Sequence, residues 1–186
     1  MKNNFYKVLA ALIVFALTAC QATPAAPTEN PAIEFFKGQE GRWISVRPPT
    51  GWVAKPGGTS TSPSVIVTDD WEGYQKTNTR AVGIIILPLV DKGSAEDVLL
   101  LAVGRFSNLL TTPTTKVTLE QAAGQSYAWV EYQGKSAEKE NTLAYYFFAV
   151  ISTDQRSVLV FTSMAADQQK SVRPAYQSTV KALTLH

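Results

Sequence analysis

The chain has 186 residues, of which 45% are hydrophobic and 17% charged, with 17 basic and 15 acidic side chains. This is typical of one globular domain, because a chain of this length buries about two thirds of its surface in a single core. One cysteine is present, which excludes a disulfide framework and a cysteine-based metal site. The charges are scattered and nearly balanced, whereas nucleic-acid binding needs a clustered basic face. We therefore expect no nucleic-acid partner, and no motif predicts a metal or a cofactor.

The N-terminus carries the pattern of a lipoprotein export signal. Lys2 and Lys7 precede an unbroken apolar run over residues 8–17, followed by Thr-Ala-Cys ending at Cys20. A positive start, a short apolar run and small residues before the cut are typical of a secretory signal, and a membrane-spanning helix needs roughly 20 apolar residues. We expect cleavage between Ala19 and Cys20 and acylation of Cys20, which anchors the protein at the extracytoplasmic face of a cell membrane. The alternative is a free secreted protein in which Cys20 is incidental.

The predicted domain organisation has three parts. Residues 1–19 form the signal, and their removal takes two lysines but none of the 15 acidic residues, so the remaining chain is formally neutral. Residues 20–32 hold the lipidated cysteine and a tether with three prolines and no large apolar side chain. Such a tether extends ~3 Å per residue and cannot repay an ordering entropy of about 1–2 kcal/mol per residue. Residues 33–186 are predicted to form one globular domain.

Hydrophobic periodicity and turn residues predict seven strands and two helices. Ser94 begins a capping-box-like sequence that opens the first helix, which continues to Leu110 with an apolar stripe at 4-3-4 spacing. The second helix has Pro174 in or near its first turn, where a missing N–H matters little. The strands are expected over residues 42–47, 64–69, 81–89, 116–121, 126–133, 142–153 and 157–164, and the helices over 94–110 and 167–183.

Two of these strands indicate the architecture. The segments 143–151 and 158–161 are apolar at consecutive positions instead of alternating, which is typical of strands in the centre of a sheet that is covered on both faces. The short turn between them makes the pair antiparallel. The predicted fold class is therefore α+β, with a mostly antiparallel central sheet and helices packed on its faces.

The sequence Ile-Ser-Val-Arg-Pro-Pro-Thr-Gly-Trp over residues 44–52 resembles the strand, proline, turn and Gly-Trp opening of PsbP-like α/β/α sandwich domains. The end of the chain is similar to that family as well, with a hairpin of aromatic and β-branched strands followed by a helix. The resemblance covers roughly residues 42–185. It implies that Gly51 and Trp52 form a turn and a core anchor, not a catalytic site. Many members of the family are extracytoplasmic lipoproteins or assembly factors.

The sequence offers little that predicts catalysis. The single histidine is His186 at the C-terminus, and the densest acidic group, Asp69, Asp70 and Glu72, lacks the ligand spacing of a calcium loop. We therefore expect a non-enzymatic binding or assembly module. One alternative is a carboxylate-dependent hydrolase of envelope material, which requires a deep pocket with two acidic side chains of raised pKa. Another is a small-molecule carrier, which requires an apolar cavity of several hundred Å³.

Aromatic side chains are the remaining candidates for a binding surface, because aromatic residues are enriched at interface anchors. Among them, Trp71 and Tyr74 are surrounded by polar residues, so we expect them to be exposed and to form an interaction surface within residues 69–76. The partner would be an unknown envelope protein or ligand, in addition to the membrane that holds the anchor. The wider set that could line a groove is Trp43, Trp52, Trp71, Tyr74, Tyr127, Trp129 and Tyr132.

Overall fold

The computed structural model describes residues 30–186 except 39–40, 77–79, 92 and 137–141. The predicted signal and the acylation site at Ala19 and Cys20 lie outside the described residues. The first strand begins at Ile33, the predicted start of the domain. Contacts with the domain begin slightly earlier, because the Asn30 side-chain amide donates hydrogen bonds to the carbonyls of Pro48 and Pro49 at 3.1 and 2.8 Å.

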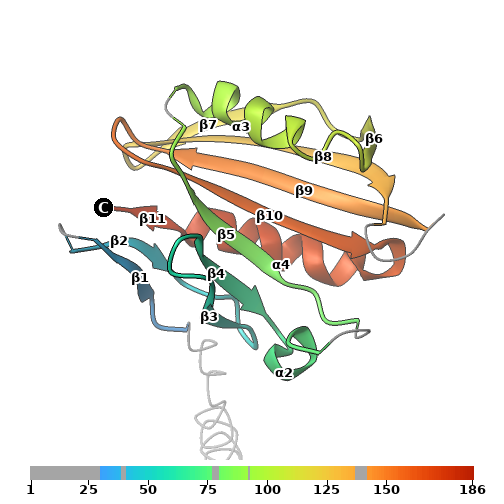
Figure 1. Ribbon diagram of the computed structural model, residues 1–186, viewed down its shortest axis with the longest axis horizontal. Helices are drawn as coiled ribbons and strands as arrows, with labels where there is room; N and C mark the ends of the chain where they lie inside the picture. Colours follow the sequence, from blue (N-terminus) through green and yellow to red (C-terminus); the bar gives the residue numbers. More distant parts are fainter. Residues whose placement is uncertain (1–29, 39–40, 77–79, 92, 137–141) are drawn as a thin grey trace, which may run out of the picture.

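The chain folds into a large antiparallel sheet, a small second sheet and three α-helices within the described residues (Figure 1). The large sheet has the order β3-β4-β5-β10-β9-β8-β6, with β7 also paired to β8, and the small sheet has the order β1-β2-β11. The strands are β1 (Ile33–Gly38), β2 (Gly41–Val46), β3 (Val53–Gly58), β4 (Pro63–Thr68), β5 (Ile84–Leu89), β6 (Leu110–Pro113), β7 (Thr118–Ala122), β8 (Gln125–Lys135), β9 (Leu143–Ser152), β10 (Ser157–Ala165) and β11 (Thr184–Leu185). The helices are α2 (Trp71–Tyr74), α3 (Ala95–Gly104) and α4 (Gln169–Ala182).

The hairpin of β9 and β10 lies in the centre of the large sheet, as the sequence predicts. The two strands pair antiparallel from Ser152 and Ser157 at the turn to Ala144 and Ala165 at the far end. Alternate residues enter cores on opposite faces: Phe147 packs in one and Phe148 in the other, and both are fully buried. Apolar and polar residues do not alternate in these two strands because the sheet is covered on both faces, as expected.

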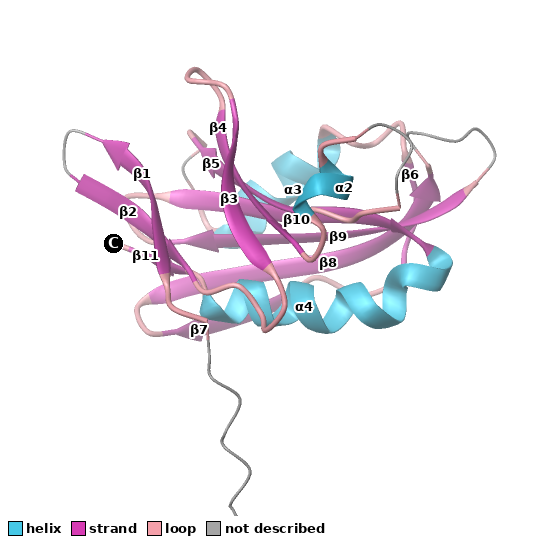
Figure 2. Cartoon of the chain, turned by 90° about the horizontal axis from the view of Figure 1, so that it is seen from below, coloured by secondary structure: helices cyan, strands magenta, loops and turns pink. Residues whose placement is uncertain are grey.

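Different elements cover the two faces (Figures 1 and 2). Helix α3 packs against β8, β9 and β10 on one face. Helix α4 packs against β9 and β10 on the opposite face, where the small sheet adds buried residues such as Ile44 to the same core. The fold class is thus the predicted one, a mostly antiparallel sheet between layers of helices. In the part of the chain that the structure describes, no helix is long and apolar enough to cross a membrane.

Helix α3 begins as predicted but ends earlier. The Ser94 hydroxyl caps it by accepting the backbone N–H of Asp97 at 3.1 Å. The helix ends at Gly104, not at Leu110, and Leu110 instead starts β6 by pairing with Gly134 of β8. The apolar stripe extends past the helix because successive turns keep Phe106 on the core side, where its ring lies 5.2 Å from that of Phe148.

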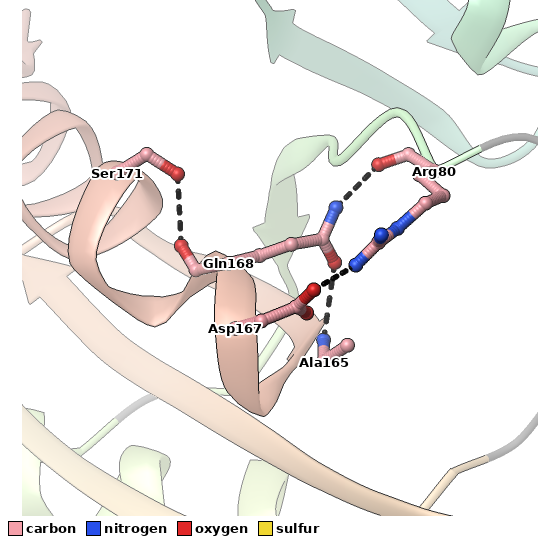
Figure 3. A network of polar contacts seen from close by, with 5 residues as sticks. All are labelled: Arg80, Ala165, Asp167, Gln168 and Ser171. Atoms are coloured by element: carbon pink, nitrogen blue, oxygen red, sulfur yellow. Dashed lines mark hydrogen bonds and ion pairs between the residues drawn. The ribbon is translucent and has the colours of Figure 1, made fainter.

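Helix α4 also differs from the expectation in one respect. Pro174 is its sixth residue and lies in the helix interior, not in the first turn. The start of the helix is held by a polar network instead of a side-chain cap: Gln168 accepts the N–H of Ala165 and donates to the carbonyl of Arg80, whose guanidinium pairs with Asp167 (Figure 3). This network joins the segment before β5 to the start of α4. Arg80 also lowers the pKa of the exposed Asp167 carboxyl through a hydrogen bond.

Several short elements were not predicted, and the structure shows why for β3, β1 and β11. Strand β3 contains Pro56 and Gly57, which weaken a strand signal but are acceptable in β3 because it is an edge strand. Strands β1 and β11 are ordered by pairing with β2, and β11 reaches β2 from the opposite end of the chain. Such pairing leaves no local signature in the sequence.

Candidate functional site

The predicted interaction surface around Trp71 and Tyr74 forms the short helix α2. Asp70 caps this helix by accepting the N–H of Gly73 at 2.8 Å. Both aromatic side chains are half-buried, and their ring centroids lie 6.4 Å apart. A Cβ atom on Gly83 would lie 2.2 Å from the Tyr74 ring, so this tyrosine lies directly on the backbone before β5. Burial raises the pKa of the Tyr74 hydroxyl. That Trp71 and Tyr74 form an interaction surface stays a prediction.

A second set of the predicted aromatic residues meets α4. Tyr127 and Trp129 lie on β8 with their side chains on the α4 face, because alternate residues of this strand enter opposite cores. Together with α4 and β7 they line a groove of about 390 Å³, which we call the α4 groove. Figure 2 shows α4 lying along this side of the sheet. The groove is lined by Glu120, Ala122, Tyr127, Trp129, Val130, Glu131, Phe148, Tyr176, Gln177, Val180 and Lys181.

One ion pair crosses between strand and helix at this groove. The Glu131 carboxylate of β8 accepts a hydrogen bond of 2.7 Å from the Arg173 guanidinium of α4, with the glutamate side chain 13% exposed. The guanidinium also lies over the Phe147 ring, 5.2 Å from its centroid. Burial raises the pKa of Glu131, and this effect exceeds the lowering by the charge and hydrogen bond of Arg173. The carboxylate is therefore held in place by a partner in an environment that disfavours its charge.

Tyr176 fixes the helix side of the groove. Its hydroxyl donates to the carbonyl of Val160 at 3.0 Å, and its ring packs 5.5 Å from that of Phe147. Burial, and secondly the negative charge of Glu131, raise the pKa of Tyr176 well above its ordinary value. The hydroxyl is thus a neutral donor committed to the backbone, and it positions the ring without taking part in proton transfer.

The arrangement is suited to binding. The aromatic side chains in its lining are buried or half-buried, whereas Glu120 on β7 and Lys181 on α4 are exposed and carry opposite charges. The acidic residue in the centre, Glu131, is occupied by Arg173. Across the described residues, no group of three or more His, Cys, Asp or Glu side chains lies close enough to hold a metal ion.

Tyr127 and Trp129 were predicted from the sequence as candidate groove residues, whereas Arg173, Tyr176 and Glu131 were not. Glu131 and Arg173 are 42 residues apart in the chain, and no motif marks either one. A partial signal is present in α4: its buried residues Val172, Ala175, Tyr176, Thr179 and Val180 recur at helical spacing, which places Tyr176 on the face that meets the sheet.

The pKa of Glu131 leads to a pH-dependent prediction for Glu131→Gln. Because the folded pKa is above the ordinary value, the folded state binds more protons than the unfolded state between these two values. The stability of the wild type relative to Glu131→Gln should therefore decrease as the pH rises through this window, and it should be constant above the folded pKa. Chemical denaturation of both proteins between pH 4 and pH 8 measures this difference. An increase over the same window would show that the attraction of Arg173 exceeds the effect of burial.

Comparisons with known proteins agree with the architecture. No protein-family model matches the sequence, and no curated protein matches it. Among solved structures, the chain is similar to cyanobacterial PsbP (CyanoP) from Synechocystis, with 14% identity, a TM-score of 0.51, and coverage of 91% of this chain and 99% of that protein. It is also similar to LpqN of Mycobacterium tuberculosis, described as involved in cell envelope biogenesis, with 15% identity, a TM-score of 0.56, and coverage of 83% and 90%.

A third similar structure is a protein from Bacteroides thetaiotaomicron, with 10% identity and a TM-score of 0.51. The match covers 86% of this chain but 49% of that protein, so this chain spans about half of its length. Identities of this size show the fold alone. The mostly antiparallel sheet, its covering helices and these neighbours together show that the chain has a PsbP-like fold.

Proposed function

We propose that this protein is a membrane-tethered, extracytoplasmic binding module that holds an apolar or aromatic segment of an envelope protein in the α4 groove. The observation that carries the proposal is the composition of the groove: buried or half-buried aromatic side chains next to exposed side chains of both charges. Protein interfaces have the same arrangement, with Trp and Tyr anchors in the centre and a polar, hydrated rim. The predicted acylation of Cys20 supplies the tether.

The contacts of Glu131 favour binding over the hydrolase alternative. Glycoside hydrolysis uses two carboxyl groups on opposite sides of the scissile bond, one of them as a proton donor. The Glu131 carboxylate instead accepts from Arg173, a permanently charged donor that has no proton to exchange at neutral pH. The described role of LpqN in cell envelope biogenesis supports an envelope context for this fold.

The experiment places a photo-crosslinking side chain at Gln177, an exposed residue that lines the α4 groove. The full lipidated chain is irradiated in its native membrane. We expect one discrete protein adduct, reduced severalfold by Trp129→Ala and by Lys181→Glu. The exposed lysine at position 181 can be replaced without disturbing the core, so its effect does not depend on folding. Leu119→Ala, which changes an exposed side chain of β7 on the other face, is the matched control and should leave the adduct unchanged.

Two further variants test the rest of the proposal. A crosslinker at Gln75, an exposed residue next to α2, tests the predicted surface of Trp71 and Tyr74. An adduct at Gln75 that Trp71→Ala removes, without one at Gln177, would move the binding site from the α4 groove to α2. Cys20→Ser should abolish acylation and leave the chain unprocessed or outside the membrane fraction. Normal lipid labelling of Cys20→Ser would contradict the anchor.

A further inference from the structure

A second concave surface lies on the opposite face of the large sheet. Helix α3 does not extend over the whole sheet, and beyond its N-terminus there is an open hollow of about 900 Å³. The start of α3, strand β7 and the turn between β9 and β10 meet at this end of the molecule (Figure 1). Because its floor carries serine side chains, we call it the serine hollow.

The floor is a row of polar side chains that register places side by side. Gln121 of β7 is opposite Ser126 of β8, which is opposite Ser152 of β9, which in turn is opposite Ser157 of β10. Residues that are directly opposite in antiparallel strands point to the same face of the sheet. Leu89 of β5 continues the row and packs with the α3-side core, which identifies the face. Four consecutive strands thus present amide and hydroxyl groups to one cavity.

Two buried hydroxyls in this row, those of Ser152 and Ser157, have no protein partner. Ser152 and Ser157 are only 5% and 4% exposed, and within the described part of the chain no hydrogen bond joins either side chain to another group. No fully enclosed side-chain oxygen or nitrogen lacks a partner there, so both hydroxyls open onto the hollow that they line. Buried hydroxyls are normally hydrogen-bonded, and each can both donate and accept. The row can therefore both donate hydrogen bonds to a bound molecule and accept hydrogen bonds from it.

The charges around the hollow restrict the class of ligand. Its walls include the carboxylates of Asp91, Glu96 and Asp154. Asp91 is paired with Arg105, which lies outside the lining. The guanidinium in the walls, that of Arg156, lies over the Trp43 ring and donates to the carbonyl of His186 at 2.7 Å. The excess of negative charge opposes the attraction of the helix N-terminus for anions, so an acidic ligand is disfavoured.

We propose that the serine hollow binds a saccharide unit without acidic groups. Such a molecule has many hydroxyls that donate and accept, which matches the floor, and it has apolar ring faces, which match Leu89 and Leu119 in the walls. The volume is within the range of about 300–1,000 Å³ for small-molecule sites. Glu120 and Tyr127 line both the hollow and the α4 groove, but the polar floor of the hollow lies on the other face of the sheet and is not part of the α4 groove. The proposal therefore does not depend on the proposed function.

The test is an NMR titration of the ¹⁵N-labelled full chain in detergent. The probes are neutral tetrasaccharides of glucose, mannose, galactose or N-acetylglucosamine, and tetragalacturonic acid of the same length. We expect at least one neutral probe to shift the amide signals of Ser152 and Ser157 saturably, and the acidic probe to bind at least about tenfold more weakly. Equal or tighter binding of the acidic probe, or no saturable shift with any neutral probe, would overturn the proposal.

Three variants complete the test. Ser152→Ala and Gln121→Ala should each weaken binding about tenfold, which is the effect of losing one hydrogen bond. Gln121 is exposed, so its replacement should not disturb the core. Ser163→Ala is the matched control, because it removes an exposed serine of the same strand as Ser157 that does not line the hollow. Trp129→Ala should leave saccharide binding unchanged. If Trp129→Ala or Lys181→Glu weakened saccharide binding instead, the saccharide would bind in the α4 groove. That result would overturn the proposal for the hollow.

Discussion

Replacing Phe148 with alanine is expected to lower the free energy of unfolding by about 3–5 kcal/mol, the range for emptying a buried aromatic site. Phe148 is fully buried in the central strand β9. Its ring is 5.2 Å from Phe106 and 6.3 Å from Phe161, so it joins the turns after α3 to strand β10. The smaller side chain would leave a cavity that these rings cannot close, because they belong to different elements held by their own strand and helix contacts.

Urea denaturation of the wild type and Phe148→Ala measures this loss, with Leu143→Ala as the matched control. Leu143 lies on the same strand but is 49% exposed, so its truncation should change the free energy of unfolding by less than about 1 kcal/mol. A near-neutral Phe148→Ala would mean that the core between α3 and the sheet is not closely packed, and the assignment of β9 to a covered, central position would fail.

The second large effect is expected at Gly134 of β8. A Cβ atom at this position would lie 2.2 Å from the carbonyl oxygen of Leu109 and 3.1 Å from the Cα of Leu110. These are backbone atoms, and the same carbonyl accepts the N–H of Lys135 at 2.8 Å. The clash therefore cannot be relieved by a side-chain rotation. Gly134→Ala should lower the free energy of unfolding by about 2–3 kcal/mol, as overpacking does in a dense interior.

Gly104→Ala is the control for this substitution and should have the opposite sign. Gly104 is the last residue of α3, and a Cβ atom there would contact nothing within 4 Å. Alanine has the higher helix propensity by up to about 1 kcal/mol, so Gly104→Ala should leave the stability unchanged or raise it slightly. Thermal melts of the two variants in the same buffer compare them directly. Equal stability of Gly134→Ala and the wild type would show that β6 does not lie against β8 at this position.

Features that depend on neighbouring residues could be predicted from the sequence. The central hairpin was predicted because residues 143–151 and 158–161 lack alternation, and the structure confirms their place in the sheet. The cap of α3 at Ser94 was predicted because serine and the residues after it form a local hydrogen-bonding unit. The end of α3 was placed too late because Phe106 keeps the helical periodicity after the backbone has left the helix. Periodicity reports which side chains face the core, and it does not report backbone hydrogen bonds.

Features that depend on contacts between distant residues were decided by the tertiary structure. Glu131 and Arg173 are brought together by the packing of α4 on the sheet. The serine row exists only because the register of β7, β8, β9 and β10 places its side chains opposite one another. A shift of one residue in any of these strands would turn its serine, or Gln121 in the case of β7, to the other face. The sequence by itself thus determined seven of the described strands, the burial of the central hairpin and the fold class, because local periodicity encodes burial. Only the tertiary structure decided which side chains share a groove or a hollow, because register and helix placement are set by the packing of the whole domain.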